Sequence, residues 1–101
     1  PCRTYRASSR TIETSMIHHA SSHFWACYGR LPIEIQHLAD KNFLLLKANP
    51  HHRSLQFKRC GKVWSARVGI SYRAIASPIE DGFLWVWIGS HAEYDKLLAE
   101  L

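Results

Sequence analysis

The sequence predicts an α+β domain, in which two N-terminal helices pack on a curved antiparallel β-sheet meander and a short C-terminal helix follows. Residues 22–48 carry apolar side chains at helical spacing and are interrupted by Gly29 and Pro32, residues that punctuate helices. Residues 55–89 read instead as short strands separated by glycine-containing turns. Helices followed by a run of strands are typical of the α+β class.

The composition indicates one domain without a membrane anchor. The chain has 101 residues and a formal net charge of +5, which favours association with polyanions. No apolar run approaches the ~20 residues that span a bilayer. The three cysteines form no CxxC pair, so we expect reduced thiols and a cytoplasmic location. Residues 1–15 lack an apolar period, and we interpret them as a flexible extension of a folded domain at 16–101.

The two predicted helices have clear end signals. Ser21 or Ser22 can cap the first helix, and Gly29 ends it. The proline that follows suits the first turn of the second helix, which Asn49-Pro50 terminates. The second helix carries a broad apolar stripe, formed by Ile35, Leu38, Ala39, Phe43, Leu45 and Leu46.

The turns of the second half set the register of the strands. A two-residue turn, Gly61-Lys62, joins residues 55–60 and 63–69 into a hairpin. A second turn follows Gly69. Together they predict the pairs Gln56–Arg67, Lys58–Ser65, Cys60–Val63, Arg67–Arg73, Ser65–Ile75 and Ala66–Ala74.

Alternation of side chains then separates two faces of the sheet. The apolar face packs on the helices and carries Leu55, Phe57, Trp64, Ala66, Val68, Tyr72, Ala74 and Ala76. The other face is expected to be open and carries Gln56, Lys58, Ser65, Arg67 and Arg73. The run at 83–89 is apolar on both sides, so it should lie inside the sheet.

The cations on the open face require a counter-charge. Arg67 and Arg73 directly opposite each other repel, and Lys58 lies one strand away. One interpretation is that Asp95 or Glu93 of the terminal helix pairs with an arginine. The other is a phosphate site, because planar guanidinium groups bind two oxygens at once.

The terminal helix begins with a capping box, in which Ser90 caps the helix and Glu93 reaches back. His91 occupies the first helical position, where the helix dipole disfavours its protonation and a neutral imidazole can accept a proton. The alternative for His91 is an exposed residue without a task. Tyr94 belongs to an apolar stripe with Leu97, Leu98 and Leu101. It is therefore either a core residue of the helix or a catalytic phenol.

Histidines elsewhere in the chain do not predict a metal site. His19 and His23 have i, i+4 spacing, but no cysteine or carboxylate completes a tetrahedral set at the usual spacing. We expect neither a metal nor another cofactor.

These residues give the chain a resemblance to the RelE/ParE superfamily of small bacterial toxins from type II toxin–antitoxin systems. The resemblance covers about residues 24–98 and includes the phrases LQFKRCGKVWSARVGISYRAI and WVWIGSHAEYDKLL. It implies a RelE-like fold, whose usual N-terminal strand has only residues 16–19 available. It also implies a cytosolic toxin that a cognate antitoxin holds inactive.

What the resemblance implies for activity differs between branches. RelE-like members cut mRNA in the ribosomal A site without metal, whereas ParE-like members poison DNA gyrase and lack the cutting residues. Arg67 and Arg73 match the strand arginines around the scissile phosphate, and Lys58 matches a basic strand residue. His91 and Tyr94 lie where several nuclease branches have a C-terminal His or Tyr.

For a RelE-like member, the resemblance implies an endoribonuclease in which an RNA 2′-OH attacks the adjacent phosphate. His91 acts as the general base, and the three cations stabilise the added negative charge. We expect Arg53, Arg59 and Lys62 to contact the RNA. Two other classes remain open, a gyrase poison without enzymatic activity and a non-toxic basic RNA-binding module.

Overall fold

The structure, a computed structural model, describes residues 17–100. The interpretation of residues 1–15 as an extension, the domain start at Met16 and the packing of Leu101 lie outside the described residues. The elements in chain order are β1 (Ile17–Ala20), α3 (Ser22–Gly29), α4 (Ile33–Ala48), the 3-10 helix η1 (Arg53–Leu55), β2 (Lys58–Cys60), β3 (Val63–Val68), β4 (Tyr72–Ile79), β5 (Gly82–Ser90) and α5 (His91–Glu100).

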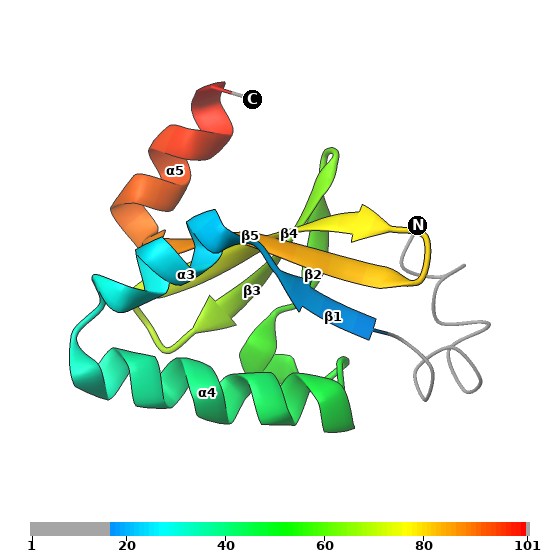
Figure 1. Ribbon diagram of the computed structural model, residues 1–101, viewed down its shortest axis with the longest axis horizontal. Coiled ribbons are helices and arrows are strands. Elements are labelled where there is room, and N and C mark those ends of the chain that lie inside the picture. The colour runs from blue at the N-terminus through cyan, green and yellow to red at the C-terminus, as the bar shows by residue number, and fades with distance from the viewer. Residues whose placement is uncertain (1–16, 101) are drawn as a thin grey trace.

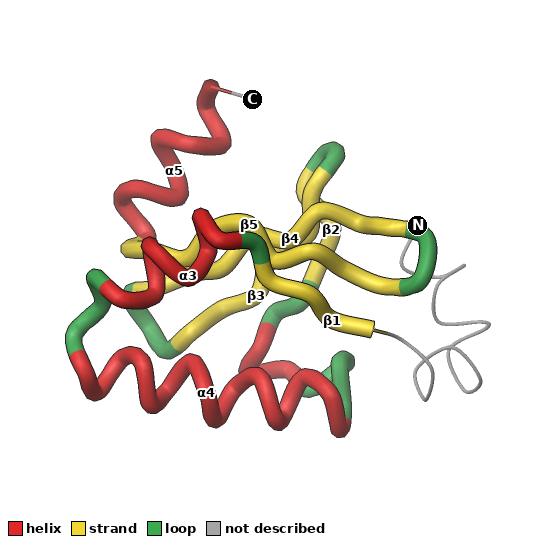
Figure 2. The backbone as a smooth tube through the Cα atoms, viewed as in Figure 1, coloured by secondary structure: helices red, strands yellow, loops and turns green. Residues whose placement is uncertain are grey.

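The strands form one sheet in the order β1-β5-β4-β3-β2 (Figure 2). Strands β2 to β5 make the predicted antiparallel meander, and the position of β5 between β1 and β4 confirms that the apolar run lies inside the sheet. Strand β1 adds a parallel pair with β5, which makes the sheet mixed. A Cβ at Gly82 would collide with the carbonyl of Ile17, so the close approach of β1 requires glycine there.

The helix ends agree closely with the capping signals. The hydroxyl of Ser21 accepts a hydrogen bond from the Phe24 backbone N–H at 3.1 Å, and α3 ends at Gly29. Pro32 lies at the N-cap of α4 rather than inside its first turn, and Asn49 is the C-cap.

Helices cover both faces of the sheet. Figure 1 shows α4 along one side of the sheet and α5 rising from the opposite side. The core lies between the sheet and the α3/α4 layer, where Cys27 and Leu46 pack against strand residues. The predicted apolar face is confirmed there, since less than 9% of the surface is exposed at Trp64, Ala66, Val68, Ala74 and Ala76.

The start of β2 differs from the prediction. Leu55 lies in η1 and is 1% exposed, and Gln56 adopts a left-handed backbone with φ 45° and ψ 43°. Because the chain bends there to bury Leu55, the strand begins only at Lys58 and the predicted Gln56–Arg67 pair does not form. The remaining predicted pairs of β2, β3 and β4 are all present.

Candidate phosphate-binding site

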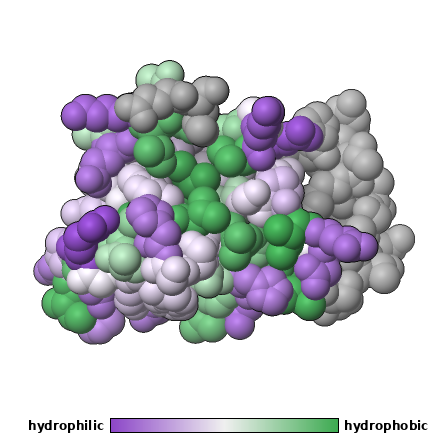
Figure 3. All heavy atoms as spheres, turned by 45° about the horizontal axis from the view of Figure 1, so that its top comes forward, coloured by the Kyte–Doolittle hydropathy of each residue, from purple (hydrophilic) through white to green (hydrophobic). Residues whose placement is uncertain are grey.

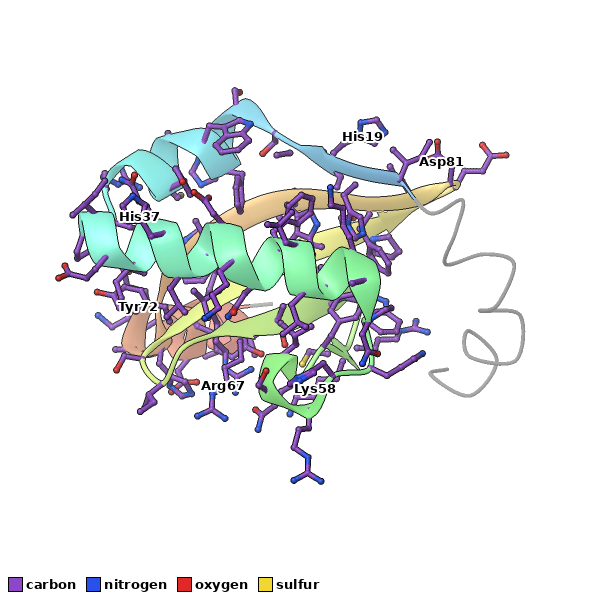
Figure 4. All side chains as sticks on the ribbon, turned by 90° about the horizontal axis from the view of Figure 1, so that it is seen from below. His19, His37, Lys58, Arg67, Tyr72 and Asp81 are labelled. Carbon is purple, nitrogen blue, oxygen red and sulfur yellow. The ribbon has the colours of Figure 1, made fainter. Side chains whose placement is uncertain are left out.

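The sheet brings three cations onto the face opposite the core, and we call Lys58, Arg67 and Arg73 the basic face. Arg67 lies directly opposite Arg73 on the neighbouring strand. Lys58 pairs with Ser65, two residues before Arg67, so Lys58 and Arg67 are diagonal neighbours. Figure 4, viewed from the α4 side, shows Lys58 and Arg67 along the same margin of the molecule. The register therefore places the three cations side by side, as the sequence predicted.

Arg73 is held on two sides, yet most of its guanidinium lacks an acceptor. Its Nη2 donates to Gln56 Oε1 at 3.2 Å, and its Cζ lies 5.2 Å from the centroid of the Tyr94 ring. Nε and Nη1 are buried and have no hydrogen-bond partner within residues 17–100. A buried donor without an acceptor destabilises the fold by about 1–3 kcal/mol, and more when the group is charged. An anion at this face would supply the missing acceptors.

Arg67 is positioned by its own turn. Its Nε donates to the carbonyl of Gly69 at 2.9 Å, and Gly69 has φ 66° and lies against Leu38 of α4. Glycine is needed here, because a side chain would meet both a left-handed backbone and the Leu38 methyl group. The side chain of Lys58 is exposed and forms no hydrogen bond or ion pair with the described part of the chain.

The two carboxylates considered as partners for the arginines, Asp95 and Glu93, are engaged elsewhere. Asp95 Oδ2 lies 3.3 Å from His91 Nδ1. Glu93 Oε1 accepts from both the backbone N–H and the hydroxyl of Ser90, each at 3.1 Å. These two bonds hold the pKa of Glu93 below its usual value and complete the predicted capping box. Within the described residues no ion pair therefore joins a carboxylate to Arg67 or Arg73, against the pairing interpretation.

His91 lies exposed at the first position of α5, as predicted, and its backbone N–H donates to the Ser71 carbonyl at 2.7 Å. If Nδ1–H donates to Asp95, Nε2 is the nitrogen left to accept a proton. The ring centroid of His91 lies 5.9 Å from that of Tyr94. His91 therefore borders the ring on which Arg73 rests.

Tyr94 is 5% exposed, and its hydroxyl lies 3.5 Å from Cys60 Sγ. Burial is the main cause that raises the pKa of Tyr94. The buried ring suits a support for Arg73. Ser65 and Ile75, on the same side of the sheet, are 0% and 3% exposed. The expectation of a fully open face is thus wrong in part, because α5 covers its centre. Figure 3 shows hydrophilic and hydrophobic residues interspersed on the surface that faces the viewer.

The residues predicted to contact RNA lie on the edge strand β2 or close to it in sequence. Arg53 lies in η1, Arg59 on the edge strand β2 and Lys62 in the following turn, and all three are exposed. Arg59 Nε donates to the Gly61 carbonyl at 2.9 Å. Arg59 directly follows Lys58 on β2 and pairs with Trp64, whereas Arg73 lies on β4 and is half-buried.

Sequence reasoning missed the contacts that shape this site. It placed Gln56 on the correct face but gave no sign of its left-handed backbone or its contact with Arg73. It also missed the Asp95–His91 pair, although i, i+4 spacing is a usable signal. Across residues 17–100 no three His, Cys, Asp or Glu side chains gather as a metal site. No helix in this range has the length and apolarity to cross a membrane.

Comparison with solved structures identifies a similar fold. The fold is similar to that in the crystal structure of the isolated E. coli RelE toxin, with a TM-score of 0.56 and 9% sequence identity. The alignment covers 85% of this chain and 99% of the RelE chain. A scan against protein-family models found no match, and a search of curated proteins found none. Likeness at this identity concerns the fold alone, and the chain has a RelE-like fold.

Proposed function

We propose that this chain is the toxin of a toxin–antitoxin system and that it cleaves mRNA at the basic face. Its likeness to the RelE toxin supports the first part of the proposal. The observation that carries the second part is the cross-strand pair of Arg67 and Arg73, which has no carboxylate partner among the described residues. Like charges directly opposite each other destabilise a sheet. An anionic ligand would offset the repulsion between the two guanidinium groups.

The reaction that fits is transfer of the phosphoryl group within the RNA. The ribose 2′-oxygen loses its proton and attacks the adjacent phosphorus, and the bond to the 5′-oxygen breaks. The departing 5′-oxygen takes a proton from water, so a 2′,3′-cyclic phosphate and a 5′-hydroxyl result. Arg67, Arg73 and Lys58 stabilise the charge that develops on the phosphorane oxygens, and removal of one such donor typically costs about 10²–10³ in rate.

His91 supplies proton transfer in this proposal. Its Nε2 takes the 2′-OH proton, while Asp95 orients the ring through Nδ1. General base catalysis of this kind contributes typically ~10²–10⁴ in rate. Tyr94 holds Arg73 in place, and Arg53, Arg59 and Lys62 bind flanking phosphates. The antitoxin partner acts by denying RNA access to this face, in the cytoplasm.

Induction of the full chain in a bacterium tests the proposal. We expect growth arrest with loss of intact mRNA, and new RNA ends that carry a 5′-hydroxyl. A chain with Arg67→Gln and Arg73→Gln should fold and permit growth, whereas Lys41→Gln, an exposed change on α4, should remain toxic.

Other outcomes point elsewhere. Arrest with broken DNA and intact mRNA would indicate a gyrase poison of the ParE type. Normal growth with retained RNA binding would indicate a basic RNA-binding module, and would contradict the toxin proposal.

A further inference from the structure

A second candidate site lies on the core side of the sheet, and Arg67 is among the residues that line it. A cavity of about 430 Å³ lies between α4, α3, β1 and the sheet. Ligand pockets in proteins typically measure about 300–1,000 Å³ and are mostly apolar. This cavity is lined by Phe24, Trp25, Tyr28, Phe43 and Trp85, among others. Trp25 and Phe43 are 54% and 37% exposed, so the cavity can be reached from solvent.

His18 of β1 gives this apolar cavity a fixed hydrogen-bond donor. The indole Nε1–H of Trp85 donates to His18 Nδ1 at 3.1 Å. An indole nitrogen donates only, so Nδ1 must be unprotonated and the proton of the neutral ring lies on Nε2. Within the described chain Nε2 has no hydrogen-bond partner, although His18 lines the cavity. The His18 ring also packs edge-on against Phe43, with 5.4 Å between ring centroids.

A cation stands beside the same end of the cavity. Lys47 Nζ lies 4.9 Å from the centroid of the Phe43 ring. Burial, and then the charges of Lys47 and His19, lower the pKa of His18, so the ring remains neutral near pH 7. The carboxylate of Asp40, which also lines the cavity, already accepts from the Tyr28 hydroxyl at 2.7 Å. The His18 end therefore favours an anion, and the Asp40 end disfavours one.

We propose that this cavity binds a small aromatic carboxylic acid. Its ring packs among Phe24, Trp25 and Phe43, its carboxylate accepts the Nε2–H of His18, and Lys47 neutralises its charge. The aromatic lining selects a planar ring. The donor and the nearby ammonium select an acid over the corresponding neutral ring.

Titration of the ¹⁵N-labelled full chain with indole-3-acetate tests this proposal. The probe is followed through the Trp85 Nε1–H signal, which a Trp85→Phe variant assigns. Because the probe is small, we expect a saturable shift with a Kd of about 1 mM or below. Indole, the same ring without the acid, should bind more weakly. Lys47→Met should weaken indole-3-acetate binding by about two- to fivefold and leave indole binding unchanged, whereas Lys41→Met should change neither.

A substitution that fills the cavity shows whether the probe binds there or elsewhere on the protein. Ala39 lines the cavity on α4 and Ala48 is exposed on the same helix. Ala39→Leu should abolish binding, and Ala48→Leu should not. If Ala39→Leu does not fold, Ala20→Val fills the cavity from β1 instead.

Three results would overturn the proposal: no saturable shift up to about tenfold above the expected Kd, equal binding of indole and indole-3-acetate, or binding that survives the filled cavity. None of these measurements depends on RNA cleavage, so failure of the proposed nuclease leaves them intact.

Discussion

Gln56 Oε1 accepts a hydrogen bond from Arg73 Nη2 at 3.2 Å, and Gln56 is the one non-glycine residue of the described chain with a positive φ. Left-handed backbone costs a residue with a side chain about 1–3 kcal/mol and persists where the surroundings hold it. Here the strained position coincides with the contact that orients the guanidinium over Tyr94. The link makes Gln56 a positioning residue for the basic face.

Two substitutions at Gln56 distinguish the effect of its left-handed backbone from the effect of its hydrogen bond with Arg73. Both Gln56→Ala and Gln56→Gly remove the amide that holds Arg73, but only glycine relieves the left-handed backbone. We expect Gln56→Gly to be more stable than Gln56→Ala by about 1 kcal/mol, measured by urea unfolding. The two variants should cleave RNA equally slowly. If Gln56→Ala cleaves as fast as the original chain, the positioning role is wrong.

Replacement of Arg73 should separate stability from function. Arg73→Met keeps much of the volume and removes a cation whose Nε and Nη1 are buried without acceptors. Because buried donors without acceptors destabilise a fold, their removal should not lower the free energy of unfolding. Cleavage should fall by about 10²–10³. A strongly destabilised Arg73→Met would show that the guanidinium is a structural group, and Lys41→Met serves as the control.

Substitutions at Tyr94 distinguish a ring that supports Arg73 from a catalytic phenol. Tyr94→Phe keeps the ring 5.2 Å from Arg73 Cζ and loses only the hydroxyl near Cys60. Since the raised pKa keeps the phenol protonated at neutral pH, we expect Tyr94→Phe to retain cleavage within a few-fold and Tyr94→Leu to lose it. A loss of more than about 10² in Tyr94→Phe would instead assign the hydroxyl to proton transfer. Initial cleavage rates at pH 7 decide between them.

His18 should make stability depend on pH. Burial, Lys47 and His19 lower its folded pKa below the ordinary value of 6.5, so the unfolded chain binds the proton first as the pH falls. The stabilisation is therefore fully present above pH 6.5 and is lost as the pH falls from 6.5 to the lowered value. Thermal unfolding of the original chain and of His18→Gln should diverge in that window. Parallel pH profiles would contradict the assigned burial.

The local parts of the fold were predictable because turns fix register. Gly61 and Gly69 both have positive φ, as their turns demand, and they align β2, β3 and β4 so that Arg67 meets Arg73. Ser21 and Ser90 cap their helices through contacts three residues apart, which a sequence motif records directly.

The long-range parts were not predictable from local patterns. Strand β1 has four residues, too few to show a period, and its parallel pairing with β5 depends on distant chain. The contact of Tyr94 with Arg73 depends on how α5 docks across the sheet, and that docking also closes part of the expected open face. The amphipathic pattern of the helix indicated a core position for Tyr94, but it could not indicate which strand residues Tyr94 contacts.

The most direct test of the proposed chemistry is cleavage of a synthetic mRNA, presented on ribosomes, that carries a single 2′-deoxynucleotide at the mapped scission site. We predict that the purified chain cuts the all-ribose RNA to a 2′,3′-cyclic phosphate and leaves the substituted linkage intact, and that Arg73→Met cuts the all-ribose RNA about 10²–10³ more slowly. Equal cleavage of the ribose and deoxyribose linkages would contradict the proposed chemistry, because a 2′-oxygen would then have no part in breaking the chain.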